Sequence, residues 1–360
     1  MRFFLSCLFL AAFAAECAPS VEQIFKAGIL PDCQQLIYCE NAALAANPLL
    51  VPYWSEFSKE KTPEIPAGAE QNESLSGVMK VVRAVMEKMP IRDFSAVKRS
   101  QICVDWSVAV ADSKTAYKTV KYLLVYELNA PWTPTAVKAL VSQEAEDQKV
   151  ALNCVFDDEQ EILTISYPAM TDLPSCSIAF FQANQVLMIG EASLLQAAAA
   201  KVKRLIPPPT LSSAMQDARD KIAPDTQFYM LFAPDDNMRA VMQNKAPDSP
   251  VAPTVEEIVC ATFSLQARDT LALRLGLEFS TPQTANMGKA MLLDGFFMGM
   301  VRMYLMQNAS PELPMLKTMG TSLDGSHTAF SCFLTQEDIK IITPIFRKLF
   351  HSFAERAAQQ

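Results

Sequence analysis

Histidine and glycine are scarce in this chain, with 2 and 10 residues respectively among 360. Neither histidine, His327 or His351, lies in a motif with a recognisable orienting partner, so we expect both to be structural rather than general bases. The patterns G-x-S-x-G, H-E-x-x-H, G-x-x-x-x-G-K-[ST] and G-x-G-x-x-G are absent. Serine-hydrolase, zinc-peptidase and nucleotide chemistry therefore lose their usual sequence support, and we predict no catalytic and no cofactor-binding residues.

Positive charge is also in short supply, because 31 Lys and Arg against 39 Asp and Glu give a net charge of −8. Nucleic-acid binders usually carry a basic surface, so we expect no nucleic acid as a partner. The chain has no C-x-x-C or Cys/His ligand spacing. The acidic cluster from Asp157 to Glu161 lacks the glycine and alternating ligands of a calcium loop and is interpreted as a solvated hairpin tip. We therefore predict no metal site and no cofactor.

Long hydrophobic runs are missing except at the N-terminus. There Met1 and Arg2 precede an apolar stretch, residues 3–15, that is too short to span a bilayer and offers an A-x-A cleavage site at Ala12-Phe13-Ala14. We predict a signal peptide at residues 1–18 and a secreted or periplasmic protein with no transmembrane segment in the mature chain. A lipid anchor at Cys17 is the alternative, which Glu16 disfavours because a small residue is normally needed before a lipidated cysteine.

An internal near-copy is the strongest positive feature of the sequence. Ile29-Leu30-Pro31-Asp32-Cys33-Gln34 returns as Ile222-Ala223-Pro224-Asp225-Thr226-Gln227. Three further blocks recur in the same order, namely 103–108 at 260–265, 127–133 at 278–284 and 151–156 at 329–334. We interpret the four matches as a duplication with loop insertions between strands.

Each copy shows apolar periodicities that indicate strands and helices in the order β-α-β-β-α-β. We therefore expect an α+β fold of two tandem β-α-β-β-α-β-like units, with mainly antiparallel sheets and helices packed on one face. Pro207, Pro208 and Pro209 exclude a helix and indicate a linker at 206–210, between a first repeat at 19–205 and a second at 211–360. Whether the two sheets join remains open.

Removal of the leader leaves eight cysteines, an even number in a compartment where disulfides can form. The duplication matches Cys103 and Cys154 to Cys260 and Cys332. We predict one disulfide per repeat, Cys103 with Cys154 and Cys260 with Cys332, each joining two strands of one sheet. The alternative is that these four residues are free thiols that act as small buried hydrophobic groups.

Six methionines crowd one predicted helix, 284–308, in the second copy; they are Met287, Met291, Met298, Met300, Met303 and Met306. Exported methionine-rich segments can bind copper(I) or form an adaptable apolar groove. Packing into the core is the interpretation that helical spacing favours.

Two features of the first copy carry a resemblance. Leu30-Pro31-Asp32 opens a strand, and a later hairpin ends in Val186-Leu187-Met188-Ile189-Gly190 before a helix. This pattern resembles uncharacterised secreted bacterial proteins with duplicated α+β units, over most of the mature chain. That group has no established activity, so the resemblance implies fold and location and supplies no catalytic residues.

Two classes of function follow from these observations. We expect a secreted or periplasmic protein with a non-catalytic binding or structural role in the cell envelope, where an envelope protein is the candidate partner. The alternative is a hydrolase-type enzyme with a carboxylate-based site, for which Glu127 and Glu278 are the acidic residues repeated late in a strand. Convergence of both glutamates with the acidic hairpin in one cleft would favour the enzyme, and separation would favour the binding protein.

Overall fold

A computed structural model describes residues 19–52, 73–106, 120–168, 175–204, 206–236, 239, 252–308 and 313–344. The predicted signal peptide, Cys17 and His351 lie outside these residues. No helix in this described part of the chain is long and apolar enough to cross a membrane.

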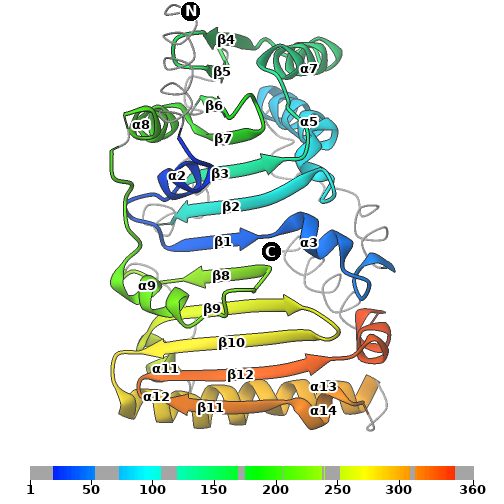
Figure 1. The fold of residues 1–360 in the computed structure, drawn as a ribbon, viewed down its shortest axis with the longest axis vertical. Helices are drawn as coiled ribbons and strands as arrows, with labels where there is room; N and C mark the ends of the chain where they lie inside the picture. Colours follow the sequence, from blue (N-terminus) through cyan, green and yellow to red (C-terminus); the bar gives the residue numbers. More distant parts are fainter. Residues whose placement is uncertain are drawn as a thin grey trace, which may run out of the picture.

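The strands form one twelve-stranded sheet in which every neighbouring pair is antiparallel (Figure 1). In chain order they are β1 (Gln35–Cys39), β2 (Val97–Asp105), β3 (Lys121–Leu128), β4 (Asn153–Asp157), β5 (Ile162–Ser166), β6 (Cys176–Phe181), β7 (Val186–Glu191), β8 (Phe228–Phe232), β9 (Ile258–Ala267), β10 (Leu271–Phe279), β11 (Gly320–Asp324) and β12 (His327–Leu334). Across the sheet their order is β11-β12-β10-β9-β8-β1-β2-β3-β7-β6-β5-β4. The predicted α+β class and antiparallel pairing are thus confirmed.

The first and second halves of the chain meet at the centre of this sheet. There β1 pairs with β8, with Ile37 opposite Met230 and Tyr38 opposite Tyr229. The two tyrosine rings are stacked with their centroids 5.1 Å apart. One continuous sheet therefore runs through both halves, which answers the question that the sequence left open.

Helices lie on both sides of the sheet. One side, which we name the α8 face, carries α2 (Val21–Ala27), α8 (Ala192–Lys203) and α9 (Ser213–Asp220). The opposite side, the α13 face, carries α3 (Asn41–Ala46), α5 (Glu73–Lys88), α7 (Pro134–Asp147), α12 (Pro282–Gly288), a π-helical segment (Lys289–Phe297), α13 (Met298–Asn308) and α14 (Met315–Thr318). A short α11 (Ala252–Glu256) contacts α12, a 3-10 turn (Pro90–Arg92) follows α5, and residues 336–344 form a helix after β12.

The prediction that helices cover only one face is wrong: both halves carry helices on both faces, and the first half shows this most clearly. Strand β3 sends Leu123 and Val125 into the apolar cluster beneath α8, while Leu124 and Tyr126 pack into the cluster that contains α7. Strands β6 and β7 are buried along nearly their whole length. These strands are apolar on both faces rather than on alternate residues. Each face must therefore be covered, which requires a helix layer on each side.

Two long helices begin in the same way. Thr133 caps α7 by accepting a hydrogen bond from the backbone N–H of Ala136 at 3.2 Å, and Pro134 follows in the first turn. Thr281 caps α12 by accepting from the backbone N–H of Thr284 at 3.1 Å, again followed by proline. A threonine cap with a proline in the first turn is favourable, because the proline lacks an N–H that the helix would leave unsatisfied. A Thr-Pro pair in the sequence marks the start of each of these helices.

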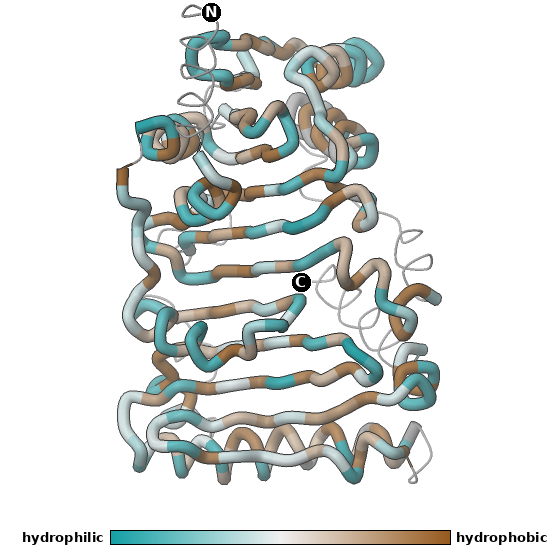
Figure 2. The backbone as a smooth tube through the Cα atoms, viewed as in Figure 1, coloured by the Kyte–Doolittle hydropathy of each residue, from teal (hydrophilic) through white to brown (hydrophobic). Residues whose placement is uncertain are grey.

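The strands of the second half differ in character between their two faces. Along β10, leucines at 271, 273, 275 and 277 alternate with Ala272, Arg274, Gly276 and Glu278, and the tube in Figure 2 alternates between brown and paler or teal residues there. The leucines join the apolar cluster of the α13 face. The small and polar residues therefore lie on the α8 face, where α9 is the helix that contacts β8, β9 and β10.

Candidate functional site

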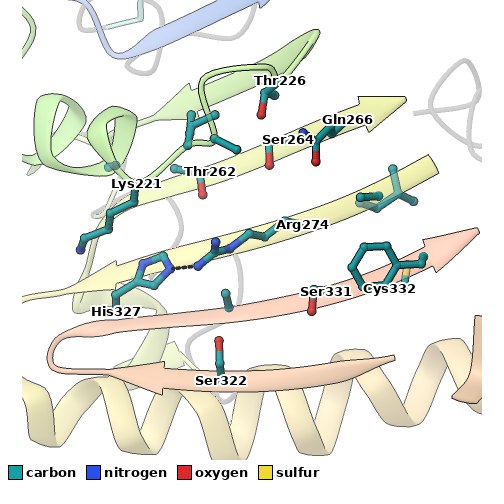
Figure 3. A pocket seen from close by; sticks show the side chains of 17 residues that line it. Lys221, Thr226, Thr262, Ser264, Gln266, Arg274, Ser322, His327, Ser331 and Cys332 are labelled. Atoms are coloured by element: carbon teal, nitrogen blue, oxygen red, sulfur yellow. Dashed lines mark hydrogen bonds between the residues drawn. The ribbon is translucent and has the colours of Figure 1, made fainter. Parts of the chain in front are cut away.

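A pocket of about 360 Å³ lies on the α8 face of the second half, between the end of α9 and strands β9 to β12 (Figure 3). Its walls combine hydroxyl groups, an amide and two cations with a few apolar side chains. The polar lining residues are Lys221, Thr226, Thr262, Ser264, Gln266, Arg274, Ser322, His327 and Ser331. The apolar lining residues include Ile222, Ala223, Leu273 and Phe333.

Arg274 occupies the middle of the pocket floor. In the ladder it stands opposite Ser264 of β9 and Ser331 of β12, so a hydroxyl side chain flanks it on each side. The arginine side chain is exposed to solvent. A guanidinium group surrounded by hydroxyl groups on an open sheet face is well placed to meet a ligand.

A hydrogen-bonded chain of charged and polar groups holds this arginine. A terminal nitrogen of Arg274 lies 3.1 Å from Nε2 of His327, and Nδ1 of the same ring lies 2.6 Å from Oε1 of Glu278. Because a guanidinium can only donate, Nε2 accepts from Arg274 and Nδ1 carries the proton that is donated to Glu278. The histidine is therefore neutral in this arrangement and connects a buried carboxylate to an exposed arginine.

Glu278 is the buried end of this chain. Its carboxylate also accepts a hydrogen bond from Nζ of Lys221 at 2.6 Å, and only 5% of the residue is exposed. Burial alone would raise the pKa of the Glu278 carboxyl, but the hydrogen bonds from His327 and Lys221 outweigh burial and lower this pKa below its ordinary value. Glu278 is thus held ionised, and its charge balances that of Lys221.

Gly276 makes the close approach of two neighbouring side chains possible. A Cβ atom at this position would lie 2.4 Å from Oγ1 of Thr262 and 2.8 Å from Cε1 of His327. Both distances are shorter than real Cβ contacts. The absence of a side chain at 276 therefore lets the ring of His327 lie across the middle of β10, where its Nε2 reaches Arg274.

The carboxylates proposed for the hydrolase alternative do not converge. Glu127 lies on β3, five strand steps from Glu278 on β10, which corresponds to about 24 Å at the spacing of sheet strands. Glu127 instead accepts a hydrogen bond from Nε of Arg99 at 2.7 Å. The acidic hairpin lies further away, between the outermost strands β4 and β5, where Oδ1 of Asp157 accepts backbone N–H groups of the turn.

The structure does not bring either predicted cysteine pair together. Cys103 on β2 and Cys154 on β4 are five strand steps apart, about 24 Å, whereas a disulfide needs Cα atoms within about 7 Å. Cys260 on β9 and Cys332 on β12 are separated by β10, on which they stand opposite Glu278 and Leu273 respectively. All four are free thiols in the structure.

The methionine-rich segment also departs from its expected role in the core. Met287, Met300, Met303 and Met306 are 51%, 44%, 56% and 62% exposed, whereas Met298 is buried. Among the described residues, no group of three or more His, Cys, Asp and Glu side chains could hold a metal ion. The packing interpretation is therefore wrong for these four exposed methionines.

A second pocket lies next to the first, at the junction of the two halves between α2 and α9. Its lining combines acidic and basic residues that largely engage one another. Arg99 pairs with Glu22 and Glu127, and Asp225 pairs with Arg268. Because Arg99 is held by two carboxylates whereas Arg274 contacts a histidine, the pocket at Arg274 is the better candidate for an anionic ligand.

Sequence reasoning missed this site although a signal for it was present. Thr262, Ser264 and Gln266 alternate on β9 as Arg274, Gly276 and Glu278 do on β10, which indicates a polar sheet face that helices cover only in part. No motif contains these residues, and their proximity depends on strand pairing. No protein-family model, curated protein or solved structure matches this chain.

Proposed function

We propose that this chain is an exported, non-catalytic binding protein that takes a small organic anion in the pocket at Arg274. The observation that carries the proposal is an exposed arginine on the pocket floor whose hydrogen bond, within the described part of the chain, goes to a neutral histidine rather than to a carboxylate. A planar guanidinium recognises carboxylate and phosphate groups through two parallel hydrogen bonds.

The charges in the pocket support an anionic ligand. Lys221 and Arg274 are the two cations in the lining, and the carboxylate of Glu278 balances the first of them. The charge of Arg274 is therefore left available in a protein whose net charge is −8. Hydroxyl groups of Thr262 and Ser264 can donate further hydrogen bonds to the same anion.

The walls of the pocket support an organic rather than a bare inorganic anion. Phe333 is 48% exposed beside the pocket, and Ile222 and Ala223 line it from the segment after α9. Apolar side chains beside oriented polar groups suit a small molecule that has both an anionic group and a short apolar portion. We assign the ligand class as a carboxylate or phosphate monoester with an apolar portion of a few carbon atoms.

We place Glu278 and His327 in a positioning role rather than in the hydrolytic role of the alternative. Both ring nitrogens of His327 are already engaged, one by Glu278 and the other by Arg274. A general base needs a free nitrogen within reach of the proton that it removes. The pair instead orients the guanidinium of Arg274, which favours binding over catalysis.

The duplication is part of the same proposal, and strand pairing supports it. Ile37 and Met230, which stand opposite each other, lie six residues after Pro31 and Pro224 of the matching sequence blocks. Equivalent residues face each other in this way where a two-fold axis crosses an antiparallel pair. The Thr-Pro start of both α7 and α12 agrees with two tandem units.

Export is proposed from the sequence of residues 1–18, with their basic start and short apolar run. In the cell envelope or outside the cell, a binding protein of this kind would meet small metabolites directly. An envelope protein remains the proposed partner for any structural role.

Ligand binding can be tested by calorimetry and thermal unfolding with the purified chain. The probes are butyrate, phenyl phosphate and inorganic phosphate, with butyramide as the neutral isostere of butyrate. We expect an organic anion to bind and raise Tm while butyramide does not. The variant Arg274→Gln should weaken binding at least about tenfold, because a charge-assisted hydrogen bond contributes about 1.5 to 3 kcal/mol.

Arg302→Gln is the matched control, because Arg302 is an exposed arginine on α13, on the other face of the sheet. This variant should bind as the wild type does. Equal affinity for butyrate and butyramide, or unchanged binding by Arg274→Gln, would contradict the proposal. Binding of inorganic phosphate alone would contradict the assignment of an organic ligand.

A further inference from the structure

The cysteine that meets Cys103 in the structure is Cys33. Cys33 lies in the turn between α2 and β1, whereas Cys103 projects from β2 toward the α8 face. Both belong to the same apolar cluster, with exposed fractions of 7% and 0%. The sequence prediction paired Cys103 with another residue because it could not place this turn.

Three hydrogen bonds fold the turn over Cys103. The backbone N–H of Leu30 donates to Sγ of Cys103 at 3.3 Å, and the backbone N–H of Cys33 donates to the carbonyl of Leu30 at 3.2 Å. The Cys33 thiol donates to the carbonyl of Gln35 at 3.4 Å. Leu30 thus connects the two cysteines, because its N–H contacts Cys103 and its carbonyl contacts the backbone of Cys33. The turn places Cys33 in the same buried corner as Cys103, which is close enough to raise the pKa of the Cys33 thiol.

No other cysteine pair in the described ranges is arranged in this way. Cys154 and Cys176 stand opposite the same residue, Ile165, but from the two sides of β5. Two strand steps separate their Cα atoms by about 10 Å, beyond the reach of a disulfide. The contact between Cys33 and Cys103 is therefore specific to the junction of α2, β1 and β2.

We propose that Cys33 and Cys103 form the structural disulfide of this protein. The oxidant is a small disulfide such as oxidised glutathione, acting while the turn is still open during folding. The Cys33 thiolate attacks one glutathione sulfur and releases a glutathione thiolate, and the Cys103 thiolate then attacks the Cys33 sulfur and releases the second. Two protein thiols are oxidised to one disulfide and one glutathione disulfide is reduced to two thiols.

The folded structure explains why the bond must form before the turn closes. Hydrogen bonding to Cys103 and burial both raise the pKa of the Cys33 thiol, so the reactive thiolate is suppressed once folding is complete. Burial also excludes a glutathione molecule from either sulfur. A bond formed early would be protected from reduction in the folded protein for the same reasons.

The inference does not depend on the ligand pocket, and its test does not depend on export. The purified full chain is refolded in a buffer of oxidised and reduced glutathione, alkylated under denaturing conditions without reductant, and digested with trypsin and chymotrypsin. Cleavage after Tyr38 separates Cys33 from Cys39, so the linked peptide identifies its cysteines by mass. We expect Cys33 linked to Cys103, and alkylated Cys33 and Cys103 would overturn the proposal.

Thermal unfolding with and without a phosphine reductant gives a second readout. Wild-type Tm should fall by about 5 to 10 °C on reduction, because the bond constrains a long loop of the unfolded chain. Cys33→Ser and Cys103→Ala should remove this dependence on reductant, while Cys176→Ser, which changes a half-buried cysteine outside this turn, should keep it. An equal Tm in both conditions for the wild type would contradict the assignment. A bond that forms in vitro but is absent from protein isolated from cells would support the site and contradict export.

Discussion

The two halves of the sheet place different residues at matching positions on the same face. Leu123 and Arg274 each lie four residues before a glutamate, on β3 and on β10, and both project toward the α8 face. Leu123 is 2% exposed and belongs to the cluster that includes Leu195 of α8, whereas Arg274 is exposed in the pocket. Whether a helix packs over the strand, rather than the strand itself, determines which residue type is tolerated at this position.

The path of the chain after the last strand of each half explains the difference in cover. After β7 the chain continues into α8, which contacts β6 and β7 on the α8 face. After β12 the helix at 336–344 turns to the other side, where Ile339 and Ile342 join the cluster of the α13 face. Asp338 fixes this path, because its buried carboxylate accepts the backbone N–H groups of Met315 and Thr335.

The largest effect is expected when the residue types at positions 123 and 274 are exchanged. Leu123→Arg should lower the free energy of unfolding by at least about 4 kcal/mol, because it places an unpaired charge beneath α8. Arg274→Leu should change it by less than about 0.5 kcal/mol, since the position is exposed. Urea denaturation measures both values. Similar losses for the two variants would show that helix cover does not distinguish the halves.

A smaller effect is expected from filling the space at Gly276. Gly276→Ala should lower the free energy of unfolding by about 1 to 3 kcal/mol, because the added methyl group would overlap Thr262 and His327. Gly320→Ala, where nothing lies within 4 Å of the added atom, serves as the control with a near-zero effect. Gly276→Ala should also weaken anion binding, because it would displace the His327 ring that orients Arg274. Equal stability of the two variants would contradict the close packing at Gly276.

The smallest effect concerns the pH dependence of the second half. The folded pKa of Glu278 is lowered, so this group stabilises the protein above the unfolded value of about 4.3, and the contribution is lost as pH falls through the folded pKa. Wild type should exceed Glu278→Gln in unfolding free energy by about 1 to 2 kcal/mol at pH 7, and the difference should shrink as the pH falls below about 4.3. Thermal unfolding across this range checks it, with the exposed Glu337→Gln as control. A difference that stays constant with pH would contradict the charged hydrogen bonds at Glu278.

Local patterns predicted most of the elements but not their assembly. The alternation on β10 and the Thr133-Pro134 cap are visible in the sequence because each depends on neighbouring residues. The approach of Lys221 to Glu278 depends on how the segment after α9 crosses the sheet. The contact of Cys33 with Cys103 depends on a turn whose hydrogen bonds connect residues far apart in the chain. Long-range pairing of this kind leaves no periodic signal.

The matching sequence blocks and the strand pairing disagree on which cysteine positions of the two halves are equivalent. The ladder places Arg99 opposite Glu127 and Cys260 opposite Glu278, so the position of Cys260 in its half is that of Arg99, not of Cys103. The hydrogen-bond donors of the two glutamates differ accordingly. Where β2 supplies Arg99 to the first glutamate, β9 supplies a thiol, and the second glutamate draws its donors from His327 and Lys221 instead.

The pairing of β1 with β8 has a consequence for the time course of synthesis. At about 5 to 20 residues per second, a ribosome needs on the order of 10 to 40 seconds between completing Cys39 and completing Phe232. During this interval β1 can pair with β2 but its other edge has no partner from the chain. An open strand edge with Leu36 and Tyr38 on one side is a template for association with other chains. The central seam of the finished sheet is therefore the point at which a nascent chain most needs a chaperone.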